Sequence, residues 1–133
     1  ILGASTRIAA GAPAMRDELL GCTFEISPTA FYQTNPAQTE VLYRLAIEGM
    51  ALEAGDTVVD AYCGSGTIGL AAAHTAAAQG IAIQLLGIER NPAGVADARR
   101  NAQINHLDGP RASKQPMPPR ILPTPHHMGN TSM

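Results

Sequence analysis

The fold of this chain is decided by one stretch, Val58-Val59-Asp60-Ala61-Tyr62-Cys63-Gly64-Ser65-Gly66-Thr67. Its first residues have the apolar, β-branched character of a buried strand, and its glycines then form a loop that opens an alanine-rich helix at about Thr67. A second strand-like run, residues 83–88, ends beside the carboxylate of Glu89. A glycine turn after one strand and a carboxylate at the tip of the next are typical of an open α/β sheet that binds an adenosine-containing cofactor.

The segments around this stretch alternate between strand and helix. The pairs Asn35-Pro36 and Asn91-Pro92 are helix starts, with Asn as the cap and Pro in the first turn. In the first of these helices, apolar residues at helical spacing share one face, which includes Val41, Leu42 and Leu45. We therefore expect, in chain order, a weak strand edge at 7–11, a strand at 23–26, a helix from 35, a strand at 57–61, a helix at 67–79, a strand at 83–88 and a helix from 91 to about 105. This order predicts a parallel sheet.

Composition limits the size, the binding partners and the cellular setting that we expect for this chain. With 133 residues and 45% hydrophobic content, the chain suffices for one modest domain. The net charge of −2 gives no support for a basic nucleic-acid surface. Two distant cysteines and the lack of a signal peptide favour a reducing, cytoplasmic setting. The sequence contains no apolar span long enough to indicate a membrane protein. The four histidines have no arrangement that suggests a metal site.

The ends of the chain suggest a fragment of a longer protein. The chain begins with Ile1, and a parallel α/β domain needs more strands than the segments up to residue 109 supply. Six of the residues in 110–133 are proline, which predicts an irregular or disordered tail. We thus expect the end of a preceding segment at 1–22, the front half of a cofactor-binding domain at 23–109 and the irregular tail at 110–133.

The glycine loop allows three interpretations. Gly64-Ser65-Gly66-Thr67-Ile68-Gly69 fits the G-x-G-x-x-G fingerprint of NAD- or FAD-binding oxidoreductases, with Glu89 as the ribose-binding acid. However, the carboxylate of Asp60 would repel a nearby pyrophosphate, whereas S-adenosylmethionine, with its sulfonium and ammonium groups, tolerates it. The extra residues Tyr62 and Cys63 before the first glycine also favour S-adenosylmethionine. In the third interpretation, the glycines serve only tight packing.

Longer segments narrow this choice. The segment Phe24–Tyr43 resembles F-x-I-S-P-x-x-F-x-Q-x-N-x-x-Q, which enters the methyltransferase domain of RNA (uracil-5-)-methyltransferases. The segment Asp60–Thr67 resembles the D-x-[YF]-C-G-x-G-T/N loop of the same family. Gly87-Ile88-Glu89 and Asn101–Asn105 resemble its G-[VI]-E and N-A-x-x-N segments, in the same order and at similar spacing. The resemblance covers about 17–109 and implies the front half of a Rossmann-like class I methyltransferase sheet, with a short β-containing entry segment before it.

The resemblance also implies an activity and a set of roles. Enzymes of this family methylate C5 of a uridine in rRNA or tRNA: a cysteine thiolate adds to C6 of a flipped-out base, and S-adenosylmethionine gives the methyl group. Carried over by motif position, Gln33, Tyr62 and Glu89 would contact S-adenosylmethionine, with Glu89 on its ribose hydroxyls. Phe31 would lie against the target nucleotide. Gly64 and Gly66 would give the backbone clearance for the cofactor, with Thr67 nearby at the helix start.

The chain departs from the family in one respect that matters for chemistry. The family's nucleophilic cysteine lies beyond the resembling part, and neither Cys22 nor Cys63 occupies its position, so no catalytic residue is assigned. We expect the full-length protein to be an RNA methyltransferase, and this chain alone to be inactive and marginally folded, with an open sheet edge and an uncovered apolar helix face. The alternatives are the nucleotide-binding half-domain of an oxidoreductase and a degenerate, non-catalytic adenosine-binding module.

Overall fold

The N-terminal part of the fold is a β-hairpin followed by a helix. The computed structural model describes residues 7–108 and 120–123. Strands β1 (Met15–Leu19) and β2 (Cys22–Ile26) pair in antiparallel fashion, and α1 (Pro36–Met50) follows them.

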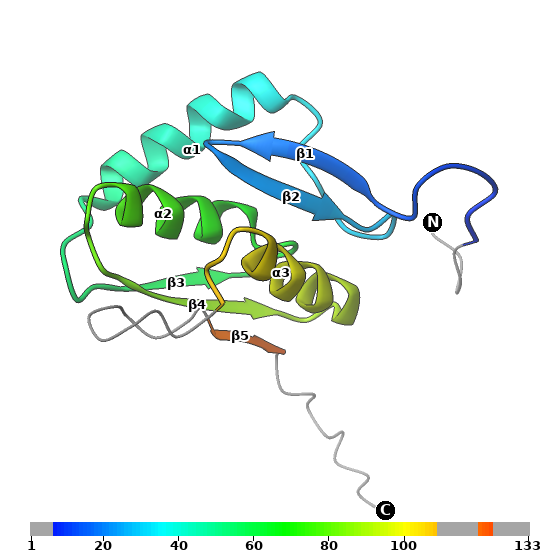
Figure 1. Cartoon of the computed structure of the whole chain (residues 1–133). Helices are drawn as coiled ribbons and strands as arrows, with labels where there is room; N and C mark the ends of the chain where they lie inside the picture. The colour runs from blue at the N-terminus through cyan, green and yellow to red at the C-terminus, as the bar shows by residue number, and fades with distance from the viewer. Residues whose placement is uncertain (1–6, 109–119, 124–133) are drawn as a thin grey trace, which may run out of the picture.

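The second part is a parallel sheet with two helices. Strand β3 (Thr57–Ala61), α2 (Thr67–Ala78), β4 (Gln84–Glu89) and α3 (Pro92–Ile104) alternate along the chain, and β5 (Arg120–Pro123) completes a sheet of order β3-β4-β5. Figure 1 shows the layering, in which α2 and α3 lie between this sheet and the hairpin. None of the helices in the described ranges has the length and apolarity needed to cross a membrane.

The core follows this layering. Its larger cluster joins the hairpin to α1 and α2 and includes Leu19, Phe24, Tyr43 and Leu70. A smaller cluster packs α3 against the sheet and consists of Cys63, Val95, Ala98 and Ile121. Burial of these apolar groups is the main favourable contribution to folding, and it fixes the glycine loop between β3 and α2.

The sequence predicted the fold class and most of the elements. The α/β architecture with a parallel sheet is confirmed, as are the strands and helices expected between residues 23 and 105, with boundaries shifted by one or two residues. The predicted caps are formed: Asn35 and Asn91 each accept a hydrogen bond from a backbone N–H of the first turn, at 3.2 and 3.0 Å. These signals are local, so they could be recognised in the sequence.

The N-terminal strand lies later than expected. The strand edge expected at 7–11 was wrong, and β1 begins at Met15. Its sequence, Met-Arg-Asp-Glu-Leu, is too polar to be recognised as a strand by composition. The hairpin forms because Leu20 and Gly21 both take positive φ values, 50° and 80°, as in a type I′ turn. It also crosses the domain boundary expected at residue 22.

Helix α1 packs through a different face than the apolar pattern suggested. Its buried residues are Thr39, Tyr43 and Ile47. Val41 and Leu42, by contrast, are more than half exposed, at 51% and 57%. The buried face is the one that meets α2 and the hairpin, where Tyr43 and Ile47 join the larger core cluster.

Strand β5 lies in the tail that was expected to be irregular. Arg120–Pro123 pairs in parallel with β4, and Gly87 lies opposite Ile121. The side chain of Ile121 is buried, 6% exposed, and belongs to the smaller core cluster. The rest of the expected tail lies outside the described residues.

Candidate functional site

The glycine loop between β3 and α2 is shaped by two glycines with different tasks. Gly64 and Gly66 have φ values of 55° and 80°, which side-chain-bearing residues rarely adopt. A Cβ on Gly66 would lie 3.1 Å from both Ala98 and Leu70, so this glycine allows the helices to pack closely. A Cβ on Gly64 would meet no atom within 4 Å. The backbone at Gly64 is therefore open to a ligand.

Glu89 connects the end of β4 to this loop. Its Oε2 accepts a hydrogen bond from the Gly64 N–H at 2.8 Å. Its Oε1 accepts from the backbone N–H groups of Arg90 and Asn91, at 2.6 and 2.7 Å. Burial acts to raise the pKa of Glu89, but the hydrogen bonds from Asn91, Gly64 and Arg90 outweigh it, and the net pKa is lowered. The carboxylate is thus held ionised beside the glycine loop.

Asp60 has a structural partner at the start of α2. Its Oδ2 accepts a hydrogen bond from the Gly69 N–H at 3.0 Å. A Cβ on Gly69 would approach that oxygen to 2.7 Å, so the third glycine lets α2 pack against β3. Burial raises the pKa of Asp60 and the charge of Glu89 raises it further, whereas the Gly69 bond lowers it.

Tyr62 and Cys63, which follow β3 directly, differ in exposure: Tyr62 faces solvent and Cys63 is buried. Tyr62 has a positive φ of 61° and a side chain that is 84% exposed. A bulky residue in this conformation is uncommon, and such strain is often found at functional sites. Cys63 is buried beneath the loop, and burial, followed by the charges of Asp60 and Glu89, raises its thiol pKa to about 12.

Cys22 is equally unreactive. It is fully buried in β2, and burial raises its pKa to about 12. The thiolate is the nucleophilic form of cysteine, so at neutral pH neither Cys22 nor Cys63 supplies one.

Thr67 has a partner that the sequence did not indicate. Its Oγ1 lies 2.7 Å from the hydroxyl of Tyr43, which comes from α1. Tyr43 is buried, and burial raises its pKa. Tyr43 stands in the segment that carries the family resemblance, but its helical position alone does not reveal a partner 24 residues away.

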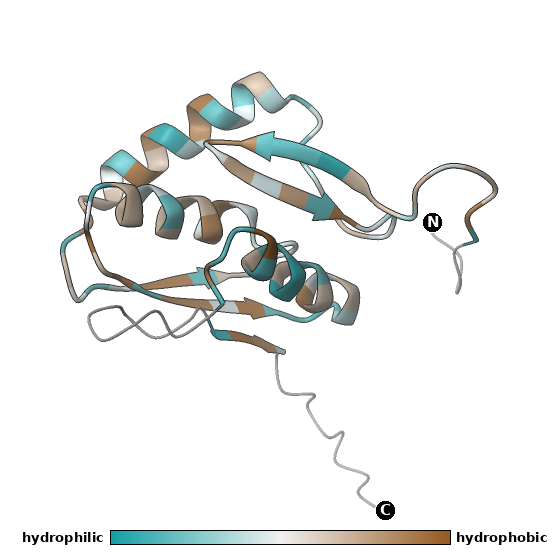
Figure 2. Cartoon of the chain, in the orientation of Figure 1, coloured by the Kyte–Doolittle hydropathy of each residue, from teal (hydrophilic) through white to brown (hydrophobic). Residues whose placement is uncertain are grey.

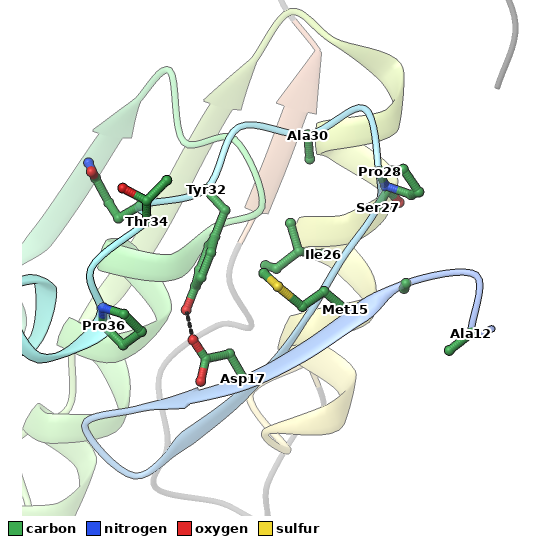
Figure 3. A pocket seen from close by; sticks show the side chains of 12 residues that line it. Ala12, Met15, Asp17, Ile26, Ser27, Pro28, Ala30, Tyr32, Thr34 and Pro36 are labelled. Atoms are coloured by element: carbon green, nitrogen blue, oxygen red, sulfur yellow. Dashed lines mark hydrogen bonds between the residues drawn. The ribbon is translucent and has the colours of Figure 1, made fainter. Parts of the chain in front are cut away.

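Phe31 and Gln33 lie on the segment between β2 and α1. Phe31 is 79% exposed. Gln33 lines a pocket of about 740 Å³ between this segment and the hairpin, together with residues that include Met15, Ile26 and Pro36. Figure 3 shows the ring of Tyr32 crossing this pocket, with its hydroxyl donating to Asp17 at 2.7 Å. Residues of the glycine loop do not line it.

The structure thus brings some of the predicted site residues together and leaves others apart. Glu89 contacts Gly64 directly, and Gly66 and Thr67 belong to the same loop and helix start. Tyr62 is exposed beside them. Within the described ranges, no hydrogen bond joins Gln33 or Phe31 to Glu89 or the glycine loop. The same residues contain no group of three His, Cys, Asp or Glu side chains that could hold a metal ion.

Comparison with known proteins finds relatives that match most of the chain. The chain is 46% identical over 107 residues to an uncharacterised RNA methyltransferase of Lactiplantibacillus plantarum, a match that covers 80% of the chain. It is 43% identical over 108 residues, 81% of the chain, to one of Enterococcus faecalis. The chain is homologous to RNA methyltransferases. It spans 21% and 22% of the length of these two curated relatives, and no protein-family model matches it.

Solved structures agree with this homology. The tRNA (uracil-54, C5)-methyltransferase of Pyrococcus abyssi, solved with S-adenosyl-L-homocysteine, matches this chain with a TM-score of 0.63 and 28% identity. The match covers 87% of this chain and 25% of that one. A SAM-dependent methyltransferase of Agrobacterium tumefaciens shares the fold at a TM-score of 0.58 and 20% identity, over 85% of this chain and 33% of its own.

Proposed function

We propose that this chain forms the front half of the cofactor site of an S-adenosylmethionine-dependent RNA (uracil-5-)-methyltransferase. The observation that carries the proposal is the contact between Gly64 and Glu89, which sets a carboxylate beside an open glycine backbone. The homology to RNA methyltransferases and the likeness to a tRNA uracil-C5 enzyme support the same function. The substrate is then a uridine of rRNA or tRNA, in the cytoplasm.

The residues of the site fit the cofactor. Glu89 Oε1 already accepts two hydrogen bonds, whereas Oε2 accepts one and keeps a lone pair for a ribose hydroxyl. Gly64 leaves room for the ligand, and the exposed ring of Tyr62 offers a flat surface next to it. The two carboxylates, Asp60 and Glu89, suit a cationic ligand better than a pyrophosphate. When bound, S-adenosylmethionine would supply the methyl group.

The roles of the remaining predicted residues belong to the same proposal. The exposed ring of Phe31 provides a face on which a flipped-out uracil can stack. Gln33 offers an amide that can hydrogen-bond the cofactor. We also propose that the chain alone does not turn over, because both of its cysteines are buried and protonated at neutral pH. The oxidoreductase alternative is not favoured, since it leaves the resemblance of residues 24–43 unexplained.

Isothermal titration of the chain with S-adenosylhomocysteine tests the cofactor site. Saturable binding that is lost in Glu89→Ala and retained in Glu18→Ala, an exposed carboxylate on the hairpin, is the expected result. NADH is titrated in parallel. Binding of NADH in place of S-adenosylhomocysteine would overturn the proposal, and so would S-adenosylhomocysteine binding that is equal in the wild type and Glu89→Ala.

A further inference from the structure

Two polar side chains of α3 and that of its C-cap residue Asn105 lie along the edge of β2 that faces away from β1. Asp97, Asn101 and Asn105 are four residues apart, so they lie on one face of the helix. They hydrogen-bond the backbone of every second residue along β2 and just beyond it, at Thr23, Glu25 and Ser27. The spacing of one helix face thus matches the spacing of one strand edge.

Asp97, Asn101 and Asn105 form a ladder of hydrogen bonds with β2 and Ser27, and the bonds of the two asparagines are reciprocal. Asn105 accepts from the Thr23 N–H at 2.9 Å and donates to its carbonyl at 2.7 Å. Asn101 does the same with Glu25, at 2.7 and 3.0 Å. Asp97 accepts from the N–H and the hydroxyl of Ser27, at 2.8 and 2.6 Å. Each amide therefore takes the place of a neighbouring strand residue.

Asn101 differs from its two neighbours because it also reaches the glycine loop. Its Nδ2 donates a second hydrogen bond, to the carbonyl of Ser65, at 3.0 Å. Asn101 is fully buried and Ser65 is 2% exposed, so water cannot replace this bond. Among the described residues, the Ser65 hydroxyl has no partner, so its carbonyl is the polar group through which Ser65 is held.

We propose that Asn101 is a positioning residue that fixes the glycine loop relative to the strand leading into Phe31 and Gln33. One planar amide joins Ser65 on the loop to Glu25 on β2, and its three bonds leave it one orientation. The inference rests on the proposed function, in which cofactor groups come from the loop and substrate groups from the segment after β2. Loss of Asn101 would let these two parts shift against each other, and small displacements of this kind weaken binding and catalysis strongly.

The chain contains a matched control for this proposal. Asn101→Ala and Asn105→Ala each remove three side-chain hydrogen bonds, two of them to β2. We expect both variants to unfold at lower urea concentration, but only Asn101→Ala to bind S-adenosylhomocysteine about tenfold more weakly, as expected for the loss of one buried hydrogen bond. Equal affinities of the two variants, at a temperature where circular dichroism shows both folded, would overturn the proposal.

A second measurement separates this proposal from that of the cofactor. The Gly66 N–H donates to the Cys63 carbonyl at 2.8 Å within the loop. We expect its hydrogen exchange to be faster in Asn101→Ala than in Asn105→Ala, whether or not the wild type binds S-adenosylhomocysteine. If Asn101→Ala does not fold, Asn101→Asp and Asn105→Asp give the same comparison with side-chain shape retained. Equal exchange at Gly66 in the two members of a pair would contradict a role of Asn101 in holding the loop.

Discussion

At the scale of single residues, Glu89 illustrates how backbone geometry controls charge. Three N–H groups, those of Gly64, Arg90 and Asn91, converge on its two oxygens. They stabilise the ionised form more than burial destabilises it, which lowers the pKa below its ordinary value of 4.5. The carboxylate therefore stabilises the loop only while it is charged.

This charge gives stability a defined pH dependence. Because the folded-state pKa of Glu89 is lowered, its contribution is fully present above the ordinary value of 4.5 and is lost as the pH falls through the folded-state value. We expect the difference in the free energy of unfolding between wild type and Glu89→Gln to shrink as the pH is lowered through this range. Urea denaturation at a series of pH values measures it.

The exposed carboxylate of Glu18 provides the control. Glu18→Gln is measured over the same pH range, and the Glu89→Gln difference is compared with it. Asp60 acts in the opposite sense, since its raised pKa means that protonation relieves a cost of folding. Glu89→Gln removes the smallest cause of that shift, the charge of Glu89, and leaves the largest, which is burial. A Glu89→Gln difference that stays constant with pH would refute the role assigned to the three N–H groups.

At the scale of elements, α1 and α2 are joined by a partly buried pair of hydroxyl groups. Tyr43 and Thr67 lie 2.7 Å apart where α2 begins, directly after the glycine loop. Removal of the Thr67 hydroxyl leaves that of the buried Tyr43 without this partner, and an unsatisfied buried hydroxyl costs more than removal of both groups. The pair thus couples the packing of α1 to the position of the loop.

A double-mutant cycle measures this coupling. We expect Tyr43→Phe and Thr67→Val each to lower the free energy of unfolding by about 1–2 kcal/mol. The double variant should lose less than the sum of the two, with a coupling energy of about 1 kcal/mol. Strict additivity in urea denaturation would mean that the two hydroxyls do not depend on each other.

The elements also show which parts of the fold could be predicted. Helices α1 and α3 were predicted because Asn35 and Asn91 cap them with signals that lie within a few residues. Strand β1 was not predicted because its sequence is polar, and β5 was not because it depends on pairing with β4 across more than 30 residues of sequence. Non-local pairing leaves little trace in composition.

The same distinction holds for the candidate site. The sequence predicted the glycines of the loop and Glu89, because a glycine turn and a carboxylate at a strand tip are recognisable patterns. It assigned no role to Tyr43 or Asn101, whose partners lie 24 and 36 residues away. One signal was available for the second, since Asp97, Asn101 and Asn105 recur at helical spacing beside a strand of alternating pattern.

At the scale of the whole molecule, the two faces of the parallel sheet differ. Helices α2 and α3 cover one face (Figure 1), and β3 alternates between half-buried residues toward the helices and exposed residues on the other side. Val59 is 54% exposed and Leu122 is 39% exposed, and Figure 2 shows hydrophobic residues along all three strands. Parallel sheets usually have both faces covered, whereas this face leaves the apolar side chains of Val59 and Leu122 partly exposed.

Polar substitution of this face tests its exposure. We expect the double variant Val59→Thr/Leu122→Thr to bind less of a dye that reports exposed apolar surface. Its free energy of unfolding should stay within about 0.5 kcal/mol of the wild-type value, as for other exposed sites. A loss of more than about 2 kcal/mol would indicate that these side chains are packed in the native state.

The hydrogen-bond ladder between α3 and β2 has a consequence for self-association at high protein concentration. A strand with unpaired N–H and C=O groups is a template on which other chains can assemble into aggregates. In β2, the groups at Thr23 and Glu25 that would recruit such a chain are already taken by Asn105 and Asn101. The amides that hold the hairpin in place therefore also oppose the addition of a strand from another molecule to β2.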